Sequence, residues 1–86
     1  MIKKKEPEKK RRKEINDPAL KKVMHRIALN VKSYRGEESL QSVGFRAKIA
    51  GTTIWEIENE MAYNVKMHTL ITLAKALGVE LEDLLK

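Results

Sequence analysis

The chain has 86 residues, of which 42% are hydrophobic and 35% are charged, so it is long enough for one small domain with a modest core. It has no cysteine, which excludes disulfides and thiolate metal ligands, and its two histidines, His25 and His68, lie too far apart in the sequence to suggest a metal site. No hydrophobic run approaches the roughly 20 residues that span a membrane, and the first residues lack a secretory hydrophobic segment, so we expect a cytoplasmic protein.

The formal net charge of +6 is concentrated at the N-terminus. Residues 1–14 contain eight Lys and Arg against three Glu, whereas residues 15–86 contain ten Lys and Arg against nine Asp and Glu. Because residues 1–16 also have few hydrophobic side chains, we predict that they form a disordered basic tail and that one domain spans residues 17–86. Such a tail either attracts polyanions, chiefly nucleic acid, or only aids solubility, and its sequence selects neither role.

The first helix is predicted from a start signal, a hydrophobic stripe and a stop signal. Asp17 is a good N-cap and Pro18 suits the first turn, while Gly36 ends the pattern. Between them, hydrophobic residues recur at three- and four-residue spacing, which predicts a helix of about five turns. The stripe consists of Leu20, Val23, Met24, Ile27, Val31 and Tyr34.

Two short helices are predicted next, separated by a turn near residues 47–50. Ser39 is the expected N-cap of the earlier one. Gly44 in a helix costs about 0.5–1 kcal/mol relative to Ala, so we expect a neighbouring helix to approach closely there. The inner residues of the two helices are Leu40, Val43, Gly44, Ala47, Ile54 and Ile57. The later helix, over about 50–59, leaves Gly51, Thr52, Trp55 and Glu56 on its open side.

Two further helices complete the predicted domain. A hydrophobic pattern from Met67 to Leu77 is followed by Gly78, which is the residue expected just beyond a helix end. A short final helix contains three leucines and begins with acidic residues, which the helix dipole favours. Met24, Met61 and Met67 are expected to fill the core. No strand pattern occurs, so we predict an all-α, compact five-helix bundle.

Two segments make the chain resemble the Cro/C1-type (Xre-like) helix-turn-helix family of phage repressors and bacterial regulators. The first is Thr53-Ile54-Trp55-Glu56-Ile57-Glu58-Asn59. The second is Asn64-Val65-Lys66-Met67-His68-Thr69-Leu70 followed by Leu73-Ala74-Lys75-Ala76-Leu77-Gly78-Val79, and the resemblance extends over about two-thirds of the chain. It implies a fold of the lambda-repressor-like DNA-binding type, with residues 17–86 as the helix-turn-helix domain. It also implies a transcription regulator, such as a repressor, that binds double-stranded DNA as a homodimer and places helix 50–59 in the major groove.

The resemblance assigns roles to individual residues. The side chains or backbone that would face the bases belong to Gly51, Thr52, Trp55 and Glu56. The residues that would lie near the DNA backbone are Ser39, Gln41, Lys48 and Asn59. The resemblance also implies a structural ion pair between Arg35 and Glu58.

The chain departs from the family pattern in the loop after Asn59, which looks one residue longer and has Glu60 and Val65 where Gly and Pro are common. It also departs at three positions before that loop. Leu40 replaces a usual Gln, Lys48 replaces the turn glycine, and Ala50 replaces a Ser or Thr cap. A left-handed Lys48 would be strained by about 1–2 kcal/mol, and the absence of a cap costs about 1 kcal/mol. Trp55 either packs half-buried against Leu40 or the loop after residue 59, or it contacts DNA or a protein.

These departures keep a second hypothesis open. On the same fold, Trp55 and the acidic third helix would serve a protein-interaction module, in an antitoxin-like or anti-regulator role. A third hypothesis is RNA binding through the tail alone. We expect no enzyme, cofactor or small-molecule substrate, since the chain has no Cys, no Ser–His pair and no phosphate-binding loop to carry a reaction.

Overall fold

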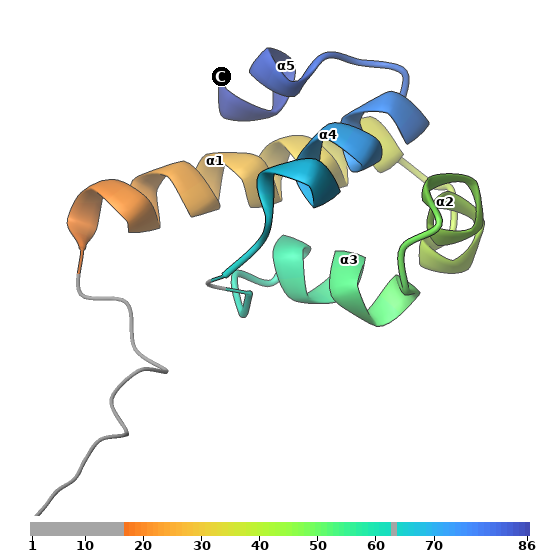
Figure 1. Cartoon of the computed structure of the whole chain (residues 1–86), viewed down its shortest axis with the longest axis horizontal. Coiled ribbons are helices and arrows are strands. Elements are labelled where there is room, and N and C mark those ends of the chain that lie inside the picture. The colour runs from red at the N-terminus through yellow and green to blue at the C-terminus, as the bar shows by residue number, and fades with distance from the viewer. Residues whose placement is uncertain (1–16, 63) are drawn as a thin grey trace, which may run out of the picture.

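A computed structural model describes residues 17–62 and 64–86 of the chain, and the predicted disordered tail, residues 1–16, lies outside the described residues. The described residues are helical, with no strand among them, as predicted (Figure 1). The five helices are α1 (Pro18–Arg35), α2 (Leu40–Ala47), α3 (Gly51–Glu58), α4 (Met67–Ala76) and α5 (Leu81–Leu85). None of them is long and apolar enough to cross a membrane.

The start and end of α1 follow from local chemistry, as predicted. The carboxylate of Asp17 accepts a hydrogen bond from the N–H of Ala19 at 3.0 Å, and Pro18 occupies the first turn. At the other end Gly36 has φ +60°, a left-handed value that a residue with a Cβ rarely adopts, and its N–H donates to the Lys32 carbonyl at 3.1 Å.

The predicted stripe of α1 is correct at its centre and wrong at one edge. Met24, Ile27 and Val31 are buried, whereas Val23 and Tyr34 are exposed. At 100° per residue the two exposed residues lie on the same edge of the stripe. The neighbouring helices do not cover that edge, and Ala28 on the opposite edge is buried instead.

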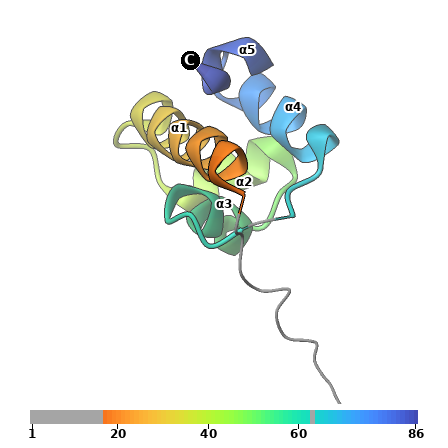
Figure 2. The same cartoon turned by 90° about the vertical axis from the view of Figure 1, so that its left-hand side faces the viewer.

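The core lies between α1 and the other four helices. Its buried residues are Met24, Ile27, Val31, Val43, Ile54, Ile57, Leu70, Leu73, Ala74 and Leu84. Both views show α1 and α4 lying between α5 on one side and α3 on the other (Figures 1 and 2). A hydrogen bond of 2.9 Å from the Asn30 amide to the Leu84 carbonyl attaches α5 to α1.

The prediction that three methionines fill the core is wrong for two of them. Met24 is buried, but Met61 and Met67 are exposed. Met61 lies in the loop between α3 and α4 and Met67 is the first residue of α4, both outside the faces that the helices pack together.

The end of α4 and the start of α5 are satisfied by hydrogen bonds from nearby backbone and side chains. Gly78 has φ +79°, and the N–H groups of Gly78 and Val79 donate to the carbonyls of Lys75 and Ala74, which is a Schellman motif. Glu80 and Asp83 form a capping box at the start of α5. The hydrogen bond from the Glu80 N–H lowers the pKa of the Asp83 carboxyl.

Gly44 is the glycine at which another segment of backbone approaches most closely. A Cβ built on Gly44 would lie 2.5 Å from the carbonyl oxygen of Ile49, and the Ile49 N–H donates to the Gly44 carbonyl at 3.0 Å. The close approach expected from the sequence is therefore present, although its partner is the turn before α3 and not the body of a helix. A glycine is required here because no side chain fits.

We expect Gly44→Ala to lower the free energy of unfolding by about 1–2 kcal/mol, because the turn must move to admit the methyl group. Gly51→Ala is the matched control. Its Cβ would lie 3.7 Å from the nearest atoms, in ordinary contact, so we expect a gain of about 0.4–1 kcal/mol. Urea denaturation of the two variants measures both values, and equal effects would contradict the role assigned to Gly44.

Candidate functional site

The turn between α2 and α3 consists of residues 48–50, close to the range that the sequence indicates. Lys48 adopts the left-handed conformation, with φ 59° and ψ 42°, and its N–H donates to the Gly44 carbonyl. Ala50 is extended and provides no side-chain acceptor for the start of α3. The turn thus combines a residue strained by about 1–2 kcal/mol with an uncapped helix start.

α3 has a buried inner face and an open outer face. Ile54 and Ile57 are fully buried. On the outer side Thr52 and Glu56 are exposed and Gly51 is partly exposed. The side chain of Trp55 is 46% exposed, so about half of its surface is available to a ligand and half is covered. The four residues expected to face DNA bases therefore all lie at least partly open to solvent.

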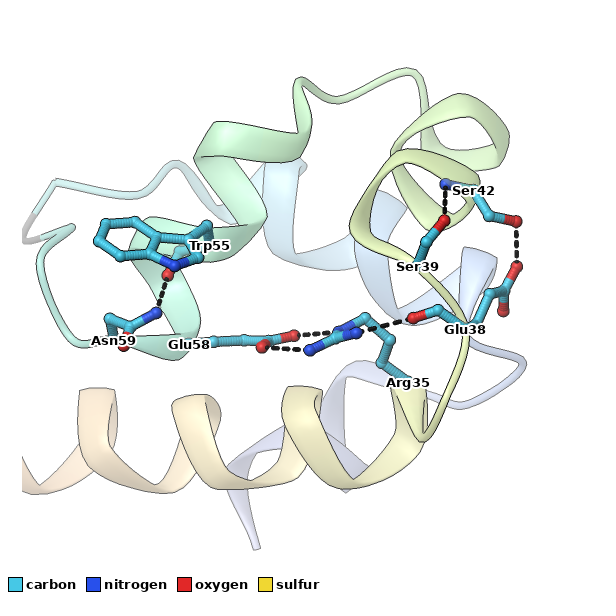
Figure 3. Close-up of polar contacts among 7 residues, drawn as sticks. All are labelled: Arg35, Glu38, Ser39, Ser42, Trp55, Glu58 and Asn59. Atoms are coloured by element: carbon cyan, nitrogen blue, oxygen red, sulfur yellow. Dashed lines mark hydrogen bonds and ion pairs between the residues drawn. The ribbon is translucent and has the colours of Figure 1, made fainter.

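The four residues expected near a DNA backbone are all exposed, but they do not form one cluster. Gln41 and Lys48 lie together at a groove that Gly51 also lines. Ser39 caps α2, accepting a hydrogen bond from the Ser42 N–H at 3.0 Å. Asn59, at the far end of α3, donates from its amide to the Trp55 carbonyl at 2.8 Å (Figure 3). Two of the four are therefore already engaged in holding helix ends.

The ion pair between Arg35 and Glu58 is present and joins the end of α1 to the end of α3. The guanidinium donates from Nε to Oε2 at 2.6 Å and from Nη2 to Oε1 at 2.8 Å, in a two-pronged geometry (Figure 3). The side chains are 18% and 3% exposed, respectively. The hydrogen bonds to Glu58 raise the pKa of Arg35, although burial opposes them. Arg35 therefore keeps the positive charge that a guanidinium group carries in proteins.

A chain of polar contacts continues from this ion pair to α2 and α4. Nη1 of Arg35 also donates to the carbonyl of Glu38 at 2.7 Å. The Glu38 carboxylate accepts from Ser42 Oγ at 2.6 Å and pairs with Arg46, whose Nη2 donates to the Ala76 carbonyl at 2.5 Å. The orientation of α3 is therefore coupled through α1 to both α2 and the end of α4.

Three features were not expected from the sequence. Phe45 on α2 is 86% exposed and lines the same groove as Gln41 and Lys48. Phe45 lies two residues from both Val43 and Ala47, which are buried, so helical periodicity places it on the outer face of α2. The exposure of Phe45 could therefore have been predicted from the sequence. His25 contacts Glu60 at 2.8 Å, which links α1 to the loop after α3. No local pattern predicts a contact between residues 35 positions apart.

The third feature is a groove between α3, the loop after it and the start of α4. It is lined by Thr53, Glu56, Ala62, Asn64, Val65, Lys66 and Thr69. Lys66 places a positive charge in the same groove as the negative charge of Glu56. Among residues 17–62 and 64–86 there is no cluster of His, Asp and Glu that could hold a metal ion.

We expect Glu58→Ala to lower the free energy of unfolding by about 2–4 kcal/mol, because a mostly covered guanidinium is then left without its partner. Replacing both members, with Arg35→Met and Glu58→Met, should recover at least half of that stability, since no charge is then left unpaired. The control is Lys86→Met, which removes the exposed pair with Asp83 at 3.2 Å and should cost less than about 0.5 kcal/mol. Thermal unfolding of the wild type and these variants measures the differences in stability. A Glu58→Ala protein as stable as the Lys86→Met control would contradict the structural role of the Arg35–Glu58 pair.

No protein-family model, curated protein or solved structure matches the chain significantly. The resemblance to the Cro/C1-type family therefore rests on the residues of the two segments named above. The five-helix, all-α architecture is shown by the structure, while the lambda-repressor-like type is part of the proposal that follows.

Proposed function

We propose that the protein is a DNA-binding transcription regulator of the lambda-repressor-like type that places α3 in the major groove of double-stranded DNA. The observation that carries the proposal is the arrangement of α2 and α3. Two eight-residue helices are joined by a three-residue turn, and the second is buried on one side and open on the other. In a helix-turn-helix protein the second helix enters the groove with its N-terminal residues at the base edges, and the first crosses the backbone.

The exposed side of α3 allows DNA bases to approach the N-terminal end of the helix closely. Gly51 has no side chain to keep the backbone away from the bases, and Thr52 beside it offers a hydroxyl and a methyl group, both of which contact base edges in other complexes. Gln41 and Lys48 flank this end of α3 at the groove on α2. In the proposed complex their side chains contact phosphates, which position a protein on DNA without reading sequence.

The basic tail supplies the charge that the domain lacks. Residues 15–86 have nearly equal numbers of basic and acidic residues, so nonspecific attraction to phosphate depends mainly on residues 1–14. A homodimer is part of the proposal, since two copies of α3 would then read a palindrome with half-sites about 34 Å apart.

Selection from random duplexes at physiological salt is the direct test, and we expect enrichment of a palindromic site. In addition, deleting residues 1–14 should make the plot of log K against log salt less steep, by about 0.9 for each phosphate that the tail neutralises. Titration of a selected duplex at several salt concentrations measures the slope. An unchanged slope would show that the tail does not contact DNA, and the absence of any enriched site would contradict the proposed function.

A second candidate function is favoured by two exposed aromatic residues. Phe45 is the most exposed large hydrophobic residue of the described chain, and Trp55 is half exposed. Exposed aromatic side chains are enriched in protein interfaces, where they act as anchors. On this alternative the same fold is a protein-interaction module, of antitoxin-like or anti-regulator type.

The fluorescence of Trp55, the single tryptophan, separates the two candidates. If α3 lies in the major groove, a selected duplex alone should quench or shift the emission, because the indole becomes covered by DNA. That result, with no protein partner present, would exclude the interaction module as the role of this face. A Phe45→Ala variant is the control. If the protein is an interaction module, this substitution should weaken partner binding, whereas the change in Trp55 emission on adding DNA does not depend on Phe45.

A further inference from the structure

Glu56 is a carboxylate in the middle of the open face of α3 that has no intramolecular partner among the described residues. It is exposed, and within residues 17–62 and 64–86 it takes part in no side-chain hydrogen bond or ion pair. Lys66 lines the same groove, but the two charged groups are more than 4.0 Å apart, beyond the limit for an ion pair.

Other carboxylates around α3 have partners. Glu58 is held by Arg35, Glu60 contacts His25, and Glu38 pairs with Arg46. These contacts explain the three residues as parts of the scaffold. Among the described residues the Glu56 side chain makes no such contact, so none of these contacts holds its carboxylate away from what α3 binds.

A carboxylate that faces DNA is repelled by the phosphates, and a base that donates a hydrogen bond to it offsets part of that repulsion. In the major groove the donors are the amino groups of cytosine N4 and adenine N6. A carboxylate has acceptors only. At adenine the acceptor N7 lies beside the amino group and repels the second carboxylate oxygen, whereas the major-groove edge of cytosine carries no acceptor.

We propose that Glu56 is a specificity-determining residue that selects cytosine at one position of the DNA site by accepting a hydrogen bond from its N4 amino group. This inference rests on the proposed function, since it requires α3 to lie in the major groove. Lys66 in the same groove reduces the repulsion between Glu56 and the phosphates, which lets an acidic residue occupy this face. Discrimination by such a contact corresponds to a loss in affinity of about 5-fold to 100-fold when the cytosine is replaced.

The test is selection from random duplexes with three full-length proteins, which are the wild type, Glu56→Gln and the control Glu82→Gln. Glu82 is an exposed carboxylate on α5, remote in sequence from α3, so its neutralisation reproduces the change in net charge alone. We expect the wild type and the control to enrich the same palindromic site, with an invariant cytosine at one position of each half-site. The Glu56→Gln protein should instead enrich adenine at that position, because an amide both accepts from N6 and donates to N7.

The outcomes separate this inference from the proposed function. If Glu56→Gln enriches the same site as the wild type, with cytosine unchanged, the inference is overturned and DNA binding stands. If the wild type enriches no site, the proposed function fails and the inference fails with it. Coincident thermal unfolding curves for the three proteins ensure that a change in site preference is not a loss of folding, since both substitutions are isosteric and on the surface.

Discussion

The position of α3 depends on the ion pair between Arg35 and Glu58. Each residue ends its helix, so the pair fixes the end of α1 against the end of α3. A buried ion pair contributes little net stability, because desolvation offsets most of the attraction. Its two-pronged geometry does restrict the angle between the helices. Through Glu38 and Arg46 the same restraint reaches α2 and α4, so the open face of α3 is presented in one orientation.

The features that the sequence predicts are those determined by local chemistry. Asp17 and Pro18 start α1, Ser39 caps α2, and Gly36 and Gly78 end helices, each through contacts within a few residues. Hydrophobic periodicity likewise identifies the inner faces of the helices. The pairing of Arg35 with Glu58, 23 residues apart, has no local signal, and only the resemblance to a known family suggested it.

The sequence did not predict which residues at the edges of the hydrophobic helix faces are exposed, because this depends on how far the neighbouring helices cover each face. Periodicity assigns Val23, Tyr34 and Met67 to hydrophobic faces, but it does not say where the covering helix ends, and all three are exposed. The contact between His25 and Glu60 arises in the same way, from the distance at which α1 passes the end of α3. The sequence likewise does not show whether the Glu56 carboxylate has an intramolecular partner, and the role proposed for Glu56 depends on this.

The two ends of α3 are held with very different strength, and this has a consequence for its local unfolding. Its C-terminal end is fixed by Arg35, while its first turn follows a strained Lys48 and an uncapped Ala50. Segments with few stabilising contacts open locally at a lower free energy than the whole domain. The amide protons of the first turn should therefore exchange with solvent faster than those near Glu58. In the proposed complex with DNA, the end of α3 nearest the bases would then be the end that can adjust to them.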